Sequence, residues 1–336
     1  TSVRLDACGL QTLEWASSCP LLTTLKASQN QLSDLAPLDG LDALYTLWLA
    51  QNQVEDLSPL ADCPALHDVV LQENQIASAK GLQEHGQLWR LSLGDNQLAN
   101  AEGLEGLGYL HALSLENNQL DDISQLADST ELERLDLSGN RLTDVSVIQD
   151  LIELEELDLA HNQLSDIGAL ASCTRLRTLL LQDNQIGDLS ALDNGFDSLA
   201  ILNVALNDVG SLVPLARCAQ LRCVVCNDNQ LTTLEGLEDK AALEVLLADS
   251  NQIADLSALA SSTSKLRQVD LGHNQVSDLS VLRSLDSGDA DEYLSLTILL
   301  DHNQVSSIAD LPNAHKYYGL ALHGNPLESL DGLPCR

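Results

Sequence analysis

The chain has 336 residues, with 50 acidic against 16 basic side chains and a formal net charge of −34. A surface of that sign repels nucleic acid and anionic membranes, so we exclude both as partners. No run reaches the ~18 apolar residues of a membrane-spanning helix, so we expect no membrane insertion. The charge favours a basic protein partner, and equally a solubility surface in a high-salt organism.

An asparagine recurs along almost the whole sequence. The spacing is 22 residues seven times in succession, and then 23, 22, 22, 23, 29 and 22. Counting back 22 residues from the first of these asparagines reaches Cys8, and cysteine also occurs at this position of the pattern L-x-x-L-x-L-x-x-N/C-x-L. The repeated asparagines are Asn30, Asn52, Asn74, Asn96, Asn118, Asn140, Asn162, Asn184, Asn207, Asn229, Asn251, Asn274, Asn303 and Asn325.

Each repeat predicts a short strand followed by a tight turn. In residues 132–148, leucines alternate with polar residues before the asparagine, as in a strand with one buried face, and apolar residues follow every third position after it. We therefore expect an α/β leucine-rich-repeat solenoid of about 15 repeats. Its parallel β-sheet would line the concave face, and short 3₁₀ or turn segments would line the convex face. The chain would be a single domain over 1–336, either complete or trimmed from something longer.

The 22-residue unit with NQ-[LIV]-x-D-[LI]-x-x-L resembles the repeats of two known groups. These are the bacterial internalins and the leucine-rich nuclear regulatory subunit of protein phosphatase 1. Segments 47–66 and 157–176 carry the likeness best. The resemblance implies a non-enzymatic protein-binding module or scaffold that engages a protein through its concave face, with no cofactor.

The residues that should face outward on the strands fall into three zones along the chain. The N-terminal zone combines Trp48 and Val70 with Arg90 nearby. Tryptophan and arginine are enriched at protein interfaces, so this zone is a candidate binding surface. The alternative is that Trp48 only shields its neighbours from water. In the middle zone, Asp136 and Asp158 are adjacent carboxylates that are expected to be solvated or to bind a partner. The C-terminal zone predicts a near-continuous apolar patch, whose members are Leu180, Ile201, Cys223, Val225, Val245, Leu247 and Leu299.

Three histidines near the C-terminal end raise a metal-site alternative. His273 and His302 occupy equivalent positions of successive repeats, and Asp301 and His323 share the neighbouring column. Histidine and carboxylate are ligands of zinc and similar ions. Nothing in the sequence fixes their convergence, so we predict ordinary surface polar groups and keep the metal site as the alternative.

The eight cysteines do not follow a disulfide pattern. Cys63 and Cys173, for example, occur at the same repeat position five repeats apart, far beyond the reach of a disulfide. Free thiols favour a reducing compartment, so we expect a cytoplasmic location. The alternative is a secreted or cell-surface protein after removal of a leader, because the sequence begins at Thr1. A further alternative function is a structural spacer in a larger assembly.

Overall fold

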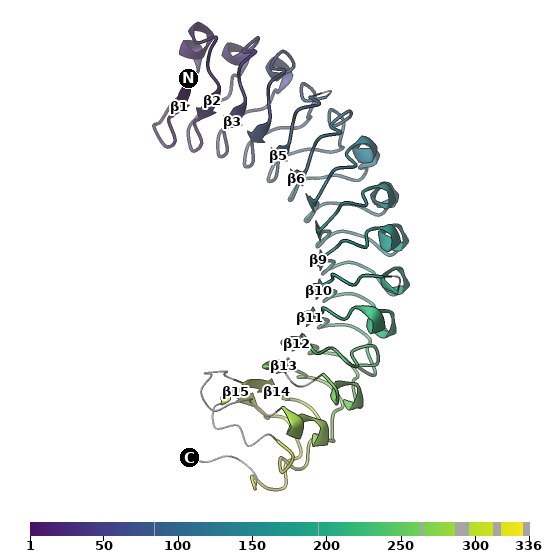
Figure 1. Cartoon of the computed structure of the whole chain (residues 1–336). Helices are drawn as coiled ribbons and strands as arrows, with labels where there is room; N and C mark the ends of the chain where they lie inside the picture. The colour runs from purple at the N-terminus through teal and green to yellow at the C-terminus, as the bar shows by residue number, and fades with distance from the viewer. Residues whose placement is uncertain (84, 194, 263–264, 286–295, 312–316, 332–336) are drawn as a thin grey trace. The chain divides into compact units, whose positions relative to one another are not determined.

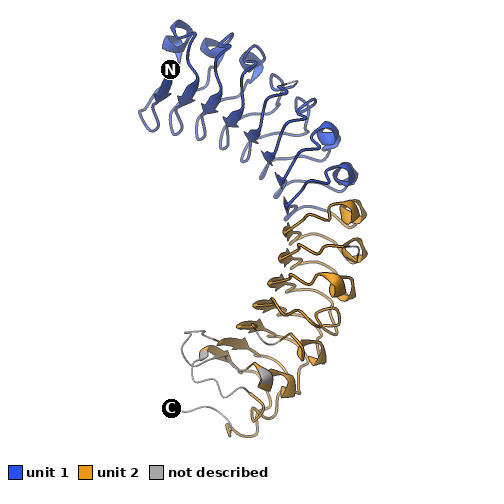
Figure 2. Cartoon of the chain, viewed as in Figure 1, with its two compact units in different colours: residues 1–163 blue, residues 164–336 orange. Residues whose placement is uncertain are grey.

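A computed structural model describes residues 1–83, 85–193, 195–262, 265–285, 296–311 and 317–331. The 29-residue spacing before Asn303 includes an acidic stretch, and residues 286–295 of it lie outside the described residues. The chain divides into two compact units, residues 1–163 and 164–336 (Figure 2). The prediction of a single domain stays a prediction, and each unit is described by itself below.

Unit 1 is a stack of coils, each of which contributes one short parallel strand. Each strand pairs with the strand of the next repeat, and the register advances by one repeat: Leu25, for example, lies opposite Val3 and Leu47. Its strands are β1 (Ser2–Arg4), β2 (Thr24–Lys26), β3 (Thr46–Trp48), β4 (Asp68–Val70), β5 (Arg90–Ser92), β6 (Ala112–Ser114), β7 (Arg134–Asp136) and β8 (Glu156–Asp158).

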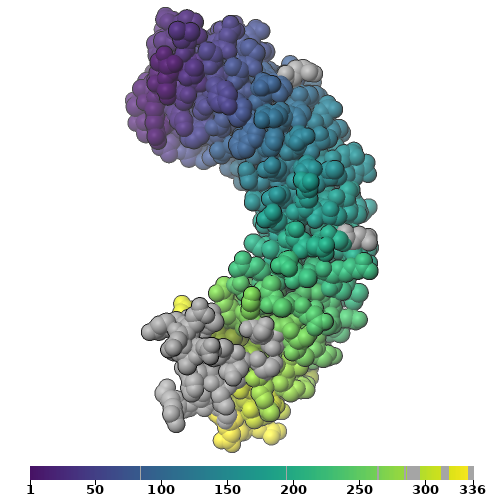
Figure 3. Space-filling model, viewed as in Figure 1, coloured from purple at the N-terminus to yellow at the C-terminus, as the bar shows by residue number. Residues whose placement is uncertain are grey.

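Unit 2 is built in the same way from parallel strands that pair in chain order. The pairing of its last two strands contains a register shift between Leu296 and Thr297. Its strands are β9 (Thr178–Leu180), β10 (Ile201–Asn203), β11 (Cys223–Val225), β12 (Val245–Leu247), β13 (Gln268–Asp270), β14 (Leu296–Leu299) and β15 (Tyr317–Ala321). In both units the coils pack directly on their sequence neighbours, so the colour of Figure 3 changes steadily along each.

The strands alternate between the core and the surface, as the leucine pattern predicts. In β7, Leu135 is buried between exposed Arg134 and half-buried Asp136. Stacking repeats buries such leucines in one row along each unit, since a single repeat cannot cover its own apolar side chains. The strands form the inner side of the curve of each unit and the turns form the outer side (Figure 1). This arrangement confirms the leucine-rich-repeat solenoid.

Most of the repeated asparagines are buried, and the row bridges consecutive coils; we call it the asparagine ladder. The Oδ1 of Asn96 accepts a hydrogen bond from the backbone N–H of Ile76 in the preceding repeat at 2.9 Å. Its Nδ2 donates to the carbonyl of Leu71 in that repeat at 3.1 Å and to the carbonyl of Leu93 in its own at 3.0 Å. Without a hydrogen-bond partner, each of these buried backbone groups would lower the free energy of unfolding by about 1–3 kcal/mol.

On the outer side, most repeats form a 3₁₀ turn that an aspartate helps to cap. Asp56 Oδ1 accepts the N–H of Ser58 at 2.9 Å, which lowers the pKa of Asp56. The turns are η1 (Glu14–Ser18), η2 (Ala36–Leu38), η3 (Ser58–Leu60), η4 (Ser124–Asp128), η5 (Ser146–Asp150), η6 (Gly168–Ser172), η7 (Ser190–Leu192), η8 (Val213–Arg217), η9 (Ser257–Leu259) and η10 (Ser280–Ser284). Among the described residues, no helix has the length and apolarity that a bilayer span requires.

Several of the cysteines occupy a buried position at which a side chain donates to the previous coil. Cys63 Sγ lies 3.2 Å from the carbonyl oxygen of Leu38, and burial raises its pKa to about 11. Lys240 fills the same repeat position and donates from Nζ to the carbonyl oxygen of Ala216 at 2.8 Å. This donor position explains the cysteine spacing without disulfides. The cytoplasmic location stays a prediction.

Candidate functional site

The Trp48 region of unit 1 is held by its own neighbours. Lys26 Nζ lies 3.1 Å from the centroid of the Trp48 ring, and Trp48 Nε1–H donates to Asp68 Oδ2 at 2.9 Å. Arg90 is exposed and lies in register beside Asp68. Val70 is only 8% exposed, so it offers a partner little surface. Trp48 is thus a half-buried ring that carries a cation on its face.

A more exposed group of rings lies beside this region, and the sequence analysis did not single it out. Four of its residues directly precede β3, β4, β5 and β6, seven positions before the repeated asparagine. We call the group the ring ridge, and its members are Tyr45, His67, Trp89, His111 and Tyr109. Reading this column along the sequence would have revealed it.

The rings of the ridge contact one another in order. Tyr45 and His67 are stacked, with centroids 4.4 Å apart and an interplanar angle of 15°. His67 and Trp89 follow at 6.1 Å, and Trp89 and His111 at 5.8 Å. Tyr109 meets His111 edge-on at 5.1 Å. These spacings lie in the range favoured by aromatic pairs.

The predicted apolar patch of unit 2 is compact at its centre and interrupted at its ends. Ile201, Cys223 and Val245 are neighbours across β10, β11 and β12. Val225 and Leu247 are also direct neighbours. Asn203 separates Leu180 from Val225, and Asp270 separates Leu247 from Leu299. Ile201 is 40% exposed and the other patch residues are half-buried, so the structure assembles five of the seven predicted members into one surface.

The three histidines of unit 2 converge with carboxylates, which the sequence did not predict. The rings of His273 and His302 stack at 4.5 Å with an angle of 20°, and His323 meets His302 edge-on at 5.0 Å. Asp301 Oδ2 lies 3.7 Å from His273 Nδ1 and 3.6 Å from His323 Nε2. The hydrogen bond to Asp249, at 3.0 Å, raises the pKa of His273.

The two neighbouring carboxylates of the middle zone, in unit 1, accept hydrogen bonds from backbone N–H groups. Asp136 and Asp158 lie in register on β7 and β8. Asp136 Oδ1 accepts the N–H of Ser138 at 3.0 Å, and Asp158 Oδ1 accepts the N–H of Ala160 at 2.9 Å. Burial raises the pKa of Asp158, and the charge of Asp136 raises it further. Both groups therefore cap the ends of their own strands.

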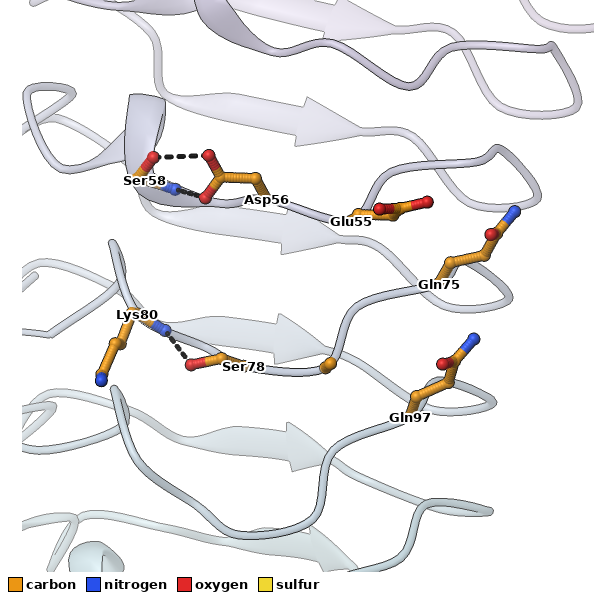
Figure 4. A pocket seen from close by; sticks show the side chains of 8 residues that line it. Glu55, Asp56, Ser58, Gln75, Ser78, Lys80 and Gln97 are labelled. Atoms are coloured by element: carbon orange, nitrogen blue, oxygen red, sulfur yellow. Dashed lines mark hydrogen bonds between the residues drawn. The ribbon is translucent and has the colours of Figure 1, made fainter.

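A shallow hollow on the outer side of unit 1 is lined by polar side chains, some of which cap turns (Figure 4). Asp56 bonds Ser58 there, and Ser78 Oγ accepts the N–H of Lys80 at 3.3 Å. Lys80 Nζ pairs with Glu102 at 2.8 Å. The labelled side chains spread along the surface instead of converging on one point, so the hollow has no arrangement suited to catalysis.

Comparisons with known proteins agree with this architecture. A family model of two-copy leucine-rich repeats matches residues 20–62, 130–172 and 152–194. The chain has the leucine-rich-repeat fold, and it resembles the bacterial internalins. No curated protein sequence matches it. The likeness to the phosphatase regulatory subunit stays a prediction.

Solved structures show how far the likeness extends. Internalin InlF from Listeria monocytogenes superimposes with a TM-score of 0.78 at 26% identity, over 95% of this chain and 86% of the internalin. A leucine-rich-repeat protein of Leptospira interrogans superimposes with a TM-score of 0.77 at 21% identity, over 95% of this chain and 77% of the Leptospira chain. A third structure is the ectodomain of the Arabidopsis receptor kinase HAESA, which was solved with an IDA peptide hormone ligand. It superimposes with a TM-score of 0.71 at 20% identity, over 94% of this chain and 60% of the HAESA chain. The fold is that of a protein-interaction module.

Proposed function

We propose that this chain is a non-enzymatic protein-binding module that holds a basic protein partner against the ring ridge of unit 1. The observation that carries this proposal is a row of five rings that contact their neighbours at the surface. The two tyrosines are exposed, and the other three rings are half-buried. Tyr45 and Tyr109 are 46% and 47% exposed, although aromatic residues make up only 3% of the sequence. Rigid aromatic side chains give large contact area at low entropic cost, and they are enriched at the centres of protein interfaces.

The charge around the ridge supports a partner with exposed lysine or arginine. Asp68 follows His67 directly at the start of β4. Glu133 and Glu155 continue the ridge's repeat position at the starts of β7 and β8. A cationic side chain gains about 0.5–2 kcal/mol over an aromatic face, and the acidic surface accelerates its approach at low salt.

The apolar patch of unit 2 is the second predicted contact, and the same experiment tests it. Its central residues Val225 and Leu247 are half-buried, whereas the two tyrosines of the ridge are exposed. We therefore expect a charge placed at Leu247 to weaken partner binding less than removal of the ridge rings. The ridge is the primary anchor in this proposal.

Affinity capture from a lysate of the source organism tests the function. The wild-type chain is compared with Tyr45→Ala/Trp89→Ala, with Leu247→Asp, and with Tyr318→Ala. Tyr318 is a matched control, because it is an aromatic residue with 85% exposure that lies outside the ridge. Captured proteins are identified by mass spectrometry, and each candidate is then titrated in purified form at low and high salt.

We expect a basic protein that is retained by wild type and by Tyr318→Ala and is lost with the double ridge variant. Its affinity should fall with salt, since charges contribute to the encounter. If the double ridge variant retains every captured protein, the ridge is not the binding site. If no protein is captured by any of the four chains, the structural-spacer alternative replaces the proposal.

A further inference from the structure

We propose that His273, Asp301 and His302 in unit 2 form a binding site for a divalent transition-metal ion, of which Zn²⁺ is the best fit. Each of these side chains offers one ligand atom, and the three atoms lie within 4.8 Å of one another. Ligands of a tetrahedral zinc lie roughly 3.4 Å apart, given bonds of about 2.1 Å. Small side-chain rotations therefore bring all three into coordinating positions.

Two further ligand-type groups border this trio. Asp249 Oδ1 lies 3.0 Å from His273 Nδ1, and His323 Nε2 lies 3.6 Å from Asp301 Oδ2. The set offers imidazole nitrogens and carboxylate oxygens, the donor types that suit zinc, copper and nickel better than the all-oxygen sites of calcium and magnesium. A fourth ligand is thus available on either side of the trio.

The backbone of the repeats holds the ligands in place. The N–H of His273 donates to the carbonyl of Asp301 at 2.8 Å, and the N–H of His302 donates to the carbonyl of His323 at 2.8 Å. His273 and His302 both have left-handed backbones, with φ of 49° and 52°. Their side chains therefore leave the coil in the same direction, one repeat apart. The stacked backbone of the two repeats sets the spacing between the two rings.

Two glycines leave the room that the ligands occupy. A Cβ at Gly272 would lie 2.5 Å from Asp249 Oδ1 and 3.2 Å from Asp301 Oδ1. A Cβ at Gly324 would lie 2.5 Å from His302 Nδ1. Any other residue at these two positions would displace the carboxylates or the imidazole. The two glycines are therefore needed for the side chains of the cluster to keep their positions.

The charge of the neighbourhood favours a bound cation. Carboxylate oxygens of Asp249, Asp270 and Asp301 all lie near the point that a Cβ at position 272 would occupy. The proximity of Asp249 and Asp301 also contributes to a raised pKa of Asp270, after the larger effect of burial. A divalent ion would offset this local excess of negative charge.

Isothermal titration of the whole chain with Zn²⁺ tests the site, together with the visible absorption bands of bound Co²⁺. The variants are Asp301→Asn and His302→Ala, which remove ligands, and Gly272→Ala, which removes none but fills the space beside Asp249 and Asp301. His161→Ala is the matched control, because His161 occupies the same repeat position as His273 but lies in unit 1. Far-UV circular dichroism verifies that each variant is folded.

We expect one Zn²⁺ per chain, with affinity reduced by more than about tenfold in Asp301→Asn, His302→Ala and Gly272→Ala. His161→Ala should bind as wild type does. The Co²⁺ bands should report nitrogen and oxygen ligands and should disappear in His302→Ala. Absence of saturable Zn²⁺ binding overturns the proposal, and so does a His161→Ala variant that loses as much affinity as His302→Ala. Protein capture by the ring ridge is independent of either result.

Discussion

The position seven residues before the repeated asparagine carries rings in four successive repeats of unit 1 and alternating charges in three successive repeats of unit 2. In unit 1 it supplies Tyr45, His67, Trp89 and His111, which form most of the ring ridge. In unit 2 it supplies three charged residues that form an ion ladder. Both Nε and Nη2 of Arg222 donate to one carboxylate oxygen of Glu244, and Arg267 pairs with the other at 2.5 Å.

The comparison shows that the repeat fixes distance while the side chain fixes the kind of interaction. Within each column, neighbouring residues are one strand spacing apart, because the strands that carry them pair with a shift of one repeat. Neighbouring side chains in a column therefore always meet. Rings at that spacing stack and stay exposed or half-buried, whereas opposite charges form ion pairs.

The largest expected effect concerns the scaffold that both columns share. Asn96→Leu in unit 1 and Asn251→Leu in unit 2 each remove an amide that bonds backbone groups of two coils. Each should lower the free energy of unfolding by about 3 kcal/mol, since several buried backbone groups lose their partners. Urea unfolding followed by circular dichroism measures the loss. A clearly unequal loss would show that the two units do not depend equally on the asparagine ladder.

Trp89→Ala should produce the next largest effect. It removes the ring contacts with His67 and His111, and each such pair contributes about 0.5–1.5 kcal/mol. We expect a loss of about 1–2 kcal/mol in the free energy of unfolding that does not depend on salt. Trp89→Phe should restore much of it, because a ring remains. A loss that disappears at high salt would contradict stacking as the cause.

Asp158→Asn should stabilise unit 1 at neutral pH. This prediction concerns a second column of outward-facing residues, which also differs between the two units. The column four residues before the asparagine pairs like charges at Asp136 and Asp158, whereas it pairs Val225 with Leu247 in unit 2. We expect a gain of about 0.5 kcal/mol, the scale of like charges on facing strand positions. Asparagine still offers an oxygen to the N–H of Ala160.

The pH dependence of this gain follows from the raised pKa of Asp158. A raised folded-state pKa contributes stability below the unfolded pKa of about 3.9, and that contribution is lost as the pH rises through the folded-state pKa. The advantage of Asp158→Asn should therefore appear at neutral pH and vanish in acid. Urea unfolding at both pH values measures it. A gain that persists in acid would point to a cause other than charge.

Arg222→Ala should produce the smallest effect. It removes one partner of Glu244 at the surface, and exposed ion pairs contribute about 0.2–1 kcal/mol. We expect a loss of under about 0.5 kcal/mol at low salt that vanishes at high salt. Arg267 stays beside Glu244 and limits the loss. A salt-independent loss as large as that of Trp89→Ala would erase the distinction between the ridge and the ion ladder.

The candidate sites show where the sequence was sufficient and where it was not. Counting from the asparagines placed Val225 beside Leu247 and put His302 one repeat after His273. The ring ridge was equally within reach of counting. Four of its residues directly precede the strands, so the alternation of buried and exposed residues within the strands does not indicate them.

The sequence by itself determined the repeat, the strand of each coil, the asparagine ladder and the columns of the exposed face. These depend on the period of leucine and asparagine, which any stacked coil must obey to bury its apolar side chains. Only the tertiary structure decided that Val70 is buried, that Lys26 and Asp68 hold Trp48, and that the histidines meet Asp301. Those outcomes depend on side-chain torsions and on space left by residues such as Gly272, which the repeat pattern does not specify.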